Sequence, residues 1–417
     1  MRGQLELTPT YEIQLDGKIL ANAHAMGDID GDGATELLFG SLMGKVSVFK
    51  SIENQLVQWK SCNVNGTVTS LCLASSIVRD TKRILVATAE GKCSSFCSVE
   101  GNRVLQLCSE FNVALNICDT VYLNSELIVA TRDGRVLVYR LNLANADDLA
   151  EFVQVAQVEI NEEIETLIML QSDLQNPDAS PRVLARCFSG HIFCIDRSSE
   201  ANAVDKQTVV PWNGPLHDND GITFVVPDIE LGGKRGMVAL VSMNGLVSLF
   251  SSLGERQWDF QLPEAVVNAD KLEMTAPDGH RHDAIVVCTW SGQIYAFQSE
   301  QRLVRFRMLL PACSMFCVGI RDLSAQIDPT IVGISTSGIV FVYRDVQETL
   351  IRGLQDSTLT DKIKESAVFY QLESSEKRKV LMKKLQNAFP QFVVSAKTAT
   401  PSVEDLIKAM LAIPLQP

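Results

Sequence analysis

Hydrophobic and polar positions repeat in one pattern along the first 345 residues. An apolar run, a turn that ends in glycine and an alternating apolar–polar run recur seven times. The turn glycines lie 43 to 56 residues apart, at Gly44, Gly91, Gly134, Gly190, Gly245, Gly292 and Gly338. Pairs such as Asp133-Gly134 and Asn244-Gly245 suit the positive φ of a tight hairpin turn. Each copy therefore predicts a β-hairpin.

Two further β-like segments separate successive hairpins, for example residues 56–60 and 68–74. Four strands at this period are typical of a β-propeller blade. The sequence predicts an all-β, seven-bladed propeller over residues 1–345. A spare strand-like segment, YEIQL at 11–15, precedes the first repeat, and we expect it to close the ring as the outer strand of the seventh blade. Residues 346–417 have a helical pattern and predict a C-terminal helical tail.

Composition argues against nucleic-acid binding, membrane insertion and a disulfide scaffold. The net charge of −13 argues against a nucleic-acid partner, because affinity for phosphate backbones rests on clustered Lys and Arg. No segment approaches the ~18 apolar residues of a membrane helix, and the N-terminus has no signal-peptide pattern. Eleven cysteines, mostly within apolar runs, fit buried free thiols. We expect a cytoplasmic protein without direct membrane insertion.

An acidic loop, GDIDGDGATE at 27–36, precedes the first hairpin. Alternating oxygen donors suit a hard cation such as Ca²⁺, and the candidate ligands are Asp28, Asp30, Asp32, the carbonyl of Ala34, and Glu36. Phe39 occupies the twelfth position, where an EF-hand needs a glutamate, so we exclude an EF-hand. Two interpretations stay open: a structural calcium loop, or an Asp/Gly turn whose carboxylates cap neighbouring amides.

Other chemistry is sparse in the sequence. We find no convergent catalytic set and no cofactor motif, so we expect no enzyme and no catalytic or cofactor-binding residues. The alternative is a propeller enzyme or ligand-binding protein that uses the central channel. It would need His, Asp or Glu at the ends of the inner strands, and inner segments such as 223–226 and 316–319 are mostly apolar. The pattern favours a platform for protein–protein interaction.

Three stretches carry a resemblance to a known family. The acidic motif DxDxDG followed by ELLFG is similar to the FG-GAP repeats of integrin α-subunits, whose calcium loops have Asp at the ninth position, here Glu36. Residues 27–50, 85–91 and 282–307 together resemble the integrin-alpha FG-GAP repeat-containing protein 2 family. The resemblance extends over nearly the whole chain and is strongest in the first and sixth repeats.

This resemblance implies a function. Members of that family are non-catalytic subunits of the KICSTOR complex, which pair with the propeller protein kaptin and dock on a very large scaffold subunit. The complex recruits to lysosomes the GTPase-activating assembly that acts on Rag GTPases, and so restrains TOR kinase signalling when amino acids are scarce. The resemblance therefore implies a cytoplasmic scaffold protein that is peripheral at the lysosomal surface through its complex.

Overall fold

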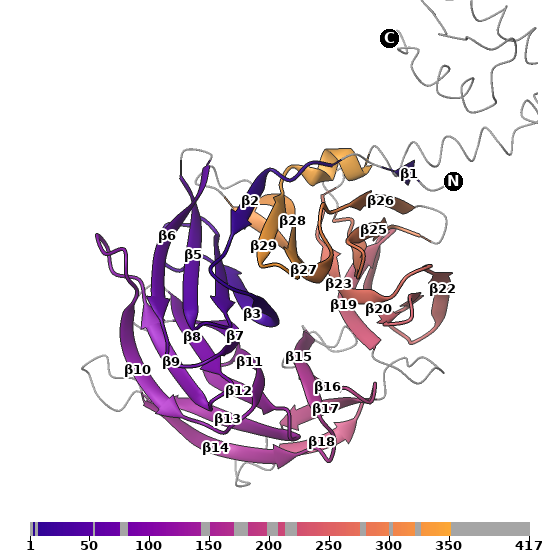
Figure 1. The fold of residues 1–417 in the computed structure, drawn as a ribbon. Coiled ribbons are helices and arrows are strands. Elements are labelled where there is room, and N and C mark those ends of the chain that lie inside the picture. The colour runs from indigo at the N-terminus through magenta and orange to yellow at the C-terminus, as the bar shows by residue number, and fades with distance from the viewer. Residues whose placement is uncertain are drawn as a thin grey trace, which may run out of the picture.

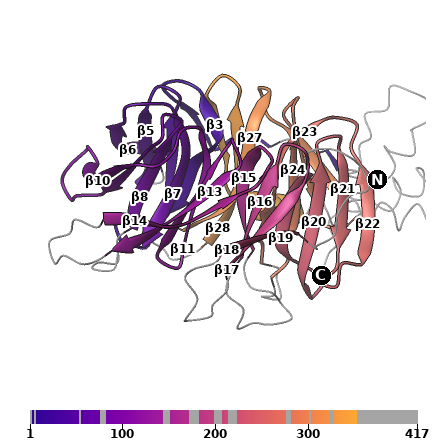
Figure 2. The ribbon, with the colours of Figure 1, turned by 90° about the horizontal axis from the view of Figure 1, so that it is seen from below.

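Seven β-sheets are arranged in a ring in the computed structural model (Figure 1). The structure describes residues 3–4, 7–52, 55–75, 82–142, 151–170, 182–197, 207–212, 223–275, 281–299, 303–321 and 327–351. Seen from the side, the blades form a flat disc whose strands cross its thickness (Figure 2). The predicted seven-bladed propeller is confirmed.

The first four blades follow the chain, each with its innermost strand first. Blade one comprises β3 (Ile19–Gly27), β4 (Glu36–Ser41), β5 (Lys45–Ile52) and β6 (Gln55–Asn63). Blade two comprises β7 (Val68–Ser75), β8 (Lys82–Thr88), β9 (Lys92–Cys97) and β10 (Gln106–Asn112). Blade three comprises β11 (Ile117–Leu123), β12 (Glu126–Thr131), β13 (Arg135–Asn142) and β14 (Glu151–Glu159). Blade four comprises β15 (Ile164–Leu170), β16 (Arg182–Cys187), β17 (Ile192–Arg197) and β18 (Gln207–Pro211).

The last three blades continue this order and close the ring. Blade five comprises β19 (Thr223–Leu231), β20 (Lys234–Ser242), β21 (Leu246–Phe250) and β22 (Arg256–Gln261). Blade six comprises β23 (Val266–Leu272), β24 (Ala284–Thr289), β25 (Gln293–Phe297) and β26 (Leu303–Arg307). Blade seven comprises β27 (Ala312–Arg321), β28 (Ile327–Ser335), β29 (Ile339–Tyr343) and, from the N-terminal segment, β2 (Tyr11–Gln14).

Two N-terminal strands join the two ends of the chain. Strand β2 pairs antiparallel with β29, with Ile13 opposite Val340, and so takes the outer place of blade seven. Strand β1 (Gly3–Gln4) adds a fifth, parallel strand outside β26 of blade six. The hydrophobic pattern did not indicate β1, because a two-residue strand is too short to show a period.

The core lies between neighbouring blades. The second strand of a blade is apolar on both faces because it packs against the blades before and after it; all six residues of β4, β12 and β24 are buried. The cluster around Phe39 includes side chains of blades one, two and seven, such as Val68 and Val340. Stacked sheets of this kind leave the inner strands facing a central channel.

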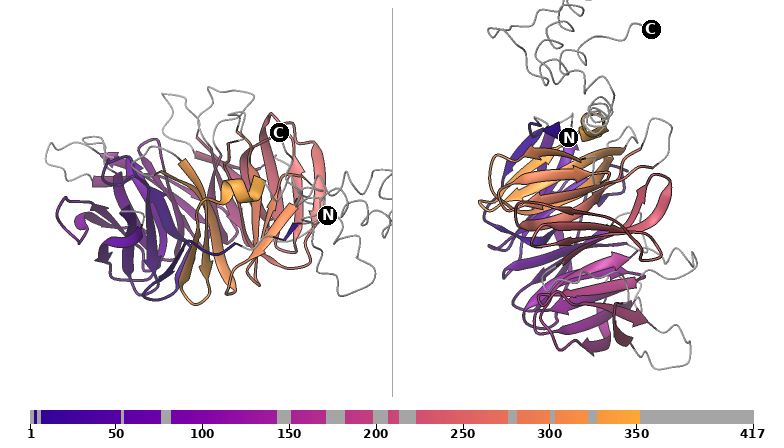
Figure 3. Two further views of the ribbon diagram at one scale, coloured as in Figure 1. Left: turned by 90° about the horizontal axis from the view of Figure 1, so that it is seen from above. Right: turned by 90° about the vertical axis from the view of Figure 1, so that its right-hand side faces the viewer.

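The predicted C-terminal helical tail lies mostly outside the described residues. Residues 346–351 are helical and lie on the outer side of the ring (Figure 3), where Val346 and Leu350 are buried against blades six and seven. Within the described part of the chain, no helix has the length and apolarity to cross a membrane. The domain boundary near residue 345 stays a prediction.

Candidate functional site

The acidic loop joins β3 to β4 at the edge of blade one. Asp28 accepts hydrogen bonds from the amides of Gly31 (2.7 Å) and Gly33 (2.8 Å), and Asp32 Oδ1 accepts one from the amide of Ala34 (2.9 Å). Glu36 is fully buried at the start of β4, and its Oε2 accepts a hydrogen bond from the amide of Ile29 (2.8 Å). Several carboxylate oxygens thus cap the loop's own backbone.

A lysine lies among the remaining carboxylate oxygens of this loop. Lys50 Nζ, from β5, is 2.8 Å from Asp30 Oδ2, 2.7 Å from Asp32 Oδ2 and 3.1 Å from Glu36 Oε1. Its ammonium also lies over the ring of Trp59 on β6, 4.7 Å from the centroid. The sequence analysis did not single out Lys50, because it follows the acidic motif by fourteen residues and reaches the loop only through the β4–β5 hairpin.

The contacts in this cluster favour the charged forms of Lys50 and Asp32, whereas burial disfavours the charged form of Glu36. Burial raises the pKa of Glu36 to about 7, against the opposing effects of the Ile29 amide and Lys50. Burial by itself would lower the pKa of Lys50, but hydrogen bonds to Asp30 and Asp32 and the charge of Glu36 raise it overall. Burial opposes ionisation of Asp32 too, yet the hydrogen bond from Lys50 lowers its pKa. Lys50 is therefore a charged ammonium at neutral pH.

The five predicted calcium ligands are only partly brought together. One ligand oxygen each from Asp28, Asp30 and Glu36 lie within 4.8 Å of one another, as in a metal-binding group. Calcium prefers six to eight oxygens, and the oxygens of Asp30, Asp32 and Glu36 that point inward already contact Lys50. A calcium ion bound by Asp30 and Glu36 would share their carboxylates with the ammonium of Lys50. Calcium binding here stays a prediction.

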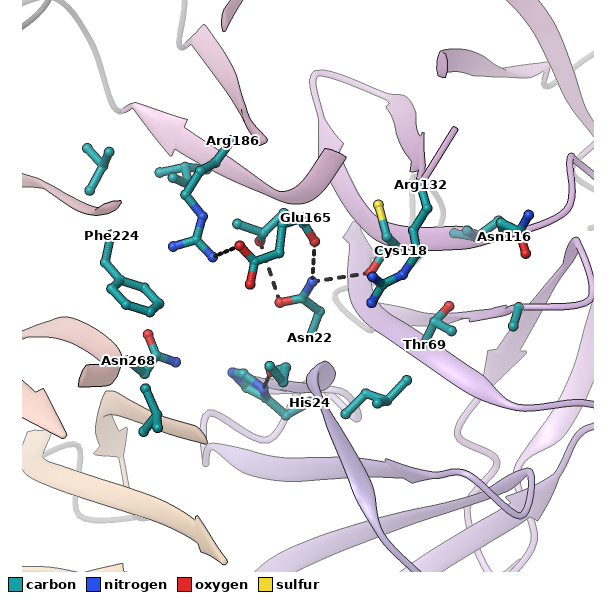
Figure 4. Close-up of a pocket in the computed structure, with 18 of the residues that line it drawn as sticks. Asn22, His24, Thr69, Asn116, Cys118, Arg132, Glu165, Arg186, Phe224 and Asn268 are labelled. Carbon is teal, nitrogen blue, oxygen red and sulfur yellow. Dashed lines mark hydrogen bonds and ion pairs between the residues drawn. The ribbon is translucent and has the colours of Figure 1, made fainter. Parts of the chain in front are cut away.

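The central channel holds a second candidate site, a cavity of about 440 Å³ (Figure 4). Polar side chains line it from the inner strands of several blades: Asn22, His24, Thr69, Glu165, Thr166 and Asn268. This differs from the expectation of a mostly apolar channel. The reason is a β-bulge in several inner strands, for example between Val68 and Ser70 and between Ile164 and Thr166, which turns the extra residue out of the alternating pattern.

A buried ion pair lies at one side of the cavity. Arg186 from β16 is 5% exposed, contacts Glu165 Oε2 at 2.9 Å and stacks over the ring of Phe224 at 4.5 Å (Figure 4). Burial lowers the pKa of Arg186, and the charge of Glu165 opposes that effect. The Nε atom of Arg186 has no hydrogen-bond partner among the described residues. The Nε–H group of Arg186 can donate a hydrogen bond to an acceptor atom of a small ligand.

Asn22 and His24 extend from β3 into the same cavity. Asn22 Nδ2 donates to the carbonyls of Cys118 (3.2 Å) and Glu165 (3.3 Å), so one side chain bridges blade one to blades three and four. His24 stacks on Phe316 with ring centroids 4.0 Å apart, and its Nδ1 donates to the Ala21 carbonyl at 2.8 Å. The two Asn22 bonds therefore link three blades from inside the channel.

Asp119 connects the inner strands of three blades beside the cavity. Its Oδ1 accepts from Ser70 Oγ (2.9 Å), and its Oδ2 accepts from Thr166 Oγ1 (2.7 Å) and from the Leu167 amide (2.8 Å). Burial raises the pKa of Asp119, although these donors oppose the rise. Asp119 has a structural role, because its carboxylate oxygens accept hydrogen bonds that link blade three to blades two and four.

The cysteine that lines the cavity is a poor candidate for a nucleophile. Cys118 is the thiol that lines the cavity; burial raises its pKa well above the ordinary range, and its Sγ lies 3.4 Å from the Ala130 carbonyl. A thiol in that environment stays protonated and is a weak nucleophile. Besides the ion pair, the cavity is lined by a second arginine (Arg132), by His24, by asparagine amides and by an aromatic ring, and such a mixture suits a ligand-binding pocket.

A model of one known protein family matches part of this chain. A family model described as "Integrin-alpha FG-GAP repeat-containing protein 2" matches residues 225–348, from blade five to the helical residues after blade seven. The chain resembles that family. The matched range does not include the acidic loop or Lys50.

Two curated relatives extend the similarity over most of the chain. A Mus musculus protein named "KICSTOR complex protein ITFG2" is 21% identical over 376 residues, which cover 80% of this chain and 84% of the relative. A Bos taurus protein of the same name is 20% identical over 384 residues and is covered to 70% of its length. The similarity therefore reaches well beyond the residues that the family model matches.

Solved structures share the fold at low identity. The structure of BBS1N in complex with ARL6DN superimposes with a TM-score of 0.58 at 17% identity, covering 82% of this chain and 98% of that chain. Saccharomyces cerevisiae Sqt1 gives a TM-score of 0.55 at 11% identity, covering 82% of this chain and 99% of that chain. These similarities support the propeller architecture and nothing finer.

Proposed function

We propose that this chain is a non-catalytic interaction subunit of a KICSTOR-like complex. In this proposal it pairs with a kaptin-like propeller protein and a large scaffold subunit in the cytoplasm. The complex then recruits the Rag-directed GTPase-activating complex to the lysosomal surface and restrains TOR signalling when amino acids are limiting. The observation that carries the proposal is the similarity to two proteins named as KICSTOR complex proteins over 80% of this chain.

The surface of the ring is consistent with a binding role. Large apolar side chains are exposed on the face that carries the turns between second and third strands, including Met243, Trp290 and Leu309. Met243 and Trp290 flank one connection, because the Val266 amide donates to the Met243 carbonyl (2.9 Å) and the Trp290 amide donates to the Ala265 carbonyl (3.0 Å). Tryptophan and methionine are enriched at the centres of protein interfaces.

Affinity purification tests the proposal. The tagged full-length chain is expressed in its own cells, and the co-purified proteins are identified and quantified by mass spectrometry. We expect a kaptin-like protein and a very large scaffold protein in stoichiometric amounts. Recovery of the chain alone, as a stable monomer, would exclude the proposed complex.

A pair of matched variants tests the exposed face within the same experiment. Trp290→Ser removes a 60% exposed side chain from the turn face, and Leu253→Ser removes a 71% exposed side chain from the β21–β22 turn at the opposite end of its blade. We expect Trp290→Ser to reduce recovery of a partner several-fold and Leu253→Ser to leave it unchanged. Equal recovery with both variants would move the interface away from Trp290.

The channel favours a second candidate, a ligand-binding protein. The supporting observation is the buried Arg186 guanidinium, whose Nε has no hydrogen-bond partner among the described residues and which lines a cavity of about 440 Å³. A thermal-shift screen of small carboxylates and phosphates tests it, with Arg186→Met as the comparison. Stabilisation of the wild type that the variant loses would support this candidate, and no shift by any compound would reject it.

A further inference from the structure

The carboxylates of the acidic loop face a cation that belongs to the protein itself, the ammonium of Lys50. The fold family implies calcium, and the ligand pattern is present at 28–36, but the three inward-facing carboxylates contact Lys50 Nζ at 2.7–3.1 Å. The contacts to Asp30 and Asp32 have the length of charge-assisted hydrogen bonds, and the contact to Glu36 Oε1 is a longer ion pair. Other loop oxygens, on Asp28 and Asp32, accept backbone amides. The oxygen set as it stands is arranged around an ammonium group.

Blade three has an equivalent pair without the acidic loop. Glu126 is the first residue of β12 and lies opposite Arg140 on β13. Arg140 binds Glu126 Oε1 through Nε (3.1 Å) and a terminal nitrogen (2.9 Å). Only Asn124 and Ser125 separate β11 from β12, so no acidic loop is present there.

Lys50 takes the same position in blade one. Glu36 is likewise the first residue of its strand, and Lys50 follows the turn glycine by six residues, as Arg140 does. The pairing of Leu37 with Phe49 places Glu36 opposite Lys50. The lysine is thus a feature of the blade's hairpin, and the acidic loop adds Asp30 and Asp32 to a pair of charges that the repeat already contains.

Blade six satisfies a buried carboxylate in a similar way. Asp283 is fully buried directly before β24, and Arg281 holds it at 2.9 Å and 3.0 Å. In blades one, three and six, a side-chain cation therefore neutralises the buried carboxylate at the start of the second strand. A buried carboxylate without a counter-charge would be strongly unfavourable.

We propose that the Lys50 ammonium is the resident cation of the acidic loop and takes the place that a calcium ion would occupy. The loop is then ordered without metal, and Trp59 helps to hold the ammonium in place. Removal of the ammonium is expected to expose an oxygen set that a divalent cation can fill, because one oxygen each of Asp30, Asp32 and Glu36 lies within 3.1 Å of the ammonium position.

Calcium dependence of thermal stability tests this proposal. The full chain is stripped of metal with a chelator, and its melting temperature and calorimetric calcium binding are measured with and without millimolar Ca²⁺. We expect the wild type to show neither binding nor a change in Tm. The Lys50→Met variant is expected to melt about 5 °C or more below the wild type in chelator. Calcium should bind to it at one site and restore much of the loss.

Arg140→Met is the matched control. It removes the equivalent cation of blade three, and we expect it to lower Tm without any recovery in calcium. Calcium binding by the wild type at one site, with a rise in Tm, would overturn the proposal, as would a Lys50→Met variant that calcium does not stabilise. Should Lys50→Met not fold in chelator, refolding that succeeds only with calcium supports the proposal, and failure in both conditions overturns it.

Discussion

At the scale of the residue, single polar side chains decide the character of the channel and of the acidic loop. Asn22 reaches two carbonyls on distant blades, and Arg186 lies buried between Glu165 and the Phe224 ring. Their neighbours in sequence are mostly apolar, so their roles depend on which direction each side chain takes. The same holds for Lys50, which meets three carboxylates that are 14 to 20 residues away in the chain.

His24 gives a pH-dependent contribution to stability. Burial lowers its pKa from 6.5 to about 4, although the Ala21 carbonyl opposes this effect. The unfolded chain takes up a proton on His24 below about pH 6.5, whereas the folded chain resists it down to about pH 4. The stability is therefore present above pH 6.5 and is lost as the pH falls from there towards 4.

Chemical denaturation of the wild type and His24→Phe at two pH values measures this contribution. Phe keeps an aromatic ring to stack on Phe316 and cannot be protonated. From about pH 7.5 to about pH 5, the wild type should lose up to about 2 kcal/mol more of its unfolding free energy than the variant does. An equal loss in both proteins would contradict the assignment of His24 as neutral in the folded chain.

At the scale of the element, the hairpin turns bring backbone segments of the blade into close contact. Gly134 has φ of 87°, and a Cβ there would lie 2.0 Å from the Ile160 carbonyl oxygen. That oxygen belongs to the connection after β14, so the turn is held against the end of its own blade; the Ile160 amide donates to the Gly134 carbonyl at 2.7 Å. Glycine is needed here for two separate reasons, the positive φ and the missing Cβ.

A pair of alanine substitutions separates the two reasons. Gly254 has φ of 81° with open space around it, so Gly254→Ala carries only the backbone cost, about 1 kcal/mol. Gly134→Ala adds the clash with Ile160 and should cost about 3 kcal/mol or more. Urea unfolding of both variants gives the comparison. Similar costs would show that the carbonyl moves aside easily.

At the scale of the whole molecule, stability depends on closing the ring. Strand β2 comes from the N-terminus and pairs with β29 from the last hairpin, so blade seven is made from both ends of the described propeller. Ile13 on β2 is buried in the cluster that also contains Phe39 of blade one. Pairing with β2 covers the edge of β29 that would otherwise be open where the two ends of the ring meet.

Disrupting this closure should destabilise the ring as a unit. Ile13→Asp places an unpaired carboxylate in the buried cluster and should lower the unfolding free energy by about 3 kcal/mol. Glu12→Gln changes the neighbouring exposed side chain of the same strand and should alter it by no more than about 0.5 kcal/mol. Calorimetry of both variants provides the measurement, and two equal melting temperatures would contradict a closure that depends on β2.

The pattern of hydrophobic and turn residues predicted four strands per repeat and a ring of seven blades, but it did not indicate β1. Hairpins are local, so turn glycines and alternating side chains specify them within about fourteen residues, and a recurring unit of four strands leaves few architectures open. The oxygen donors of the acidic loop were also visible, because they lie within ten residues of one another.

The contacts of those donors and the residues that line the channel became apparent from the packing of the blades. Lys50 reaches the loop through a hairpin register, and Arg186 reaches Glu165 across two strands of one blade. The channel residues lie next to β-bulges, where one extra residue shifts the alternation and so reverses the side that a periodic pattern assigns. Register and bulges follow from packing between blades, which no local stretch of sequence contains.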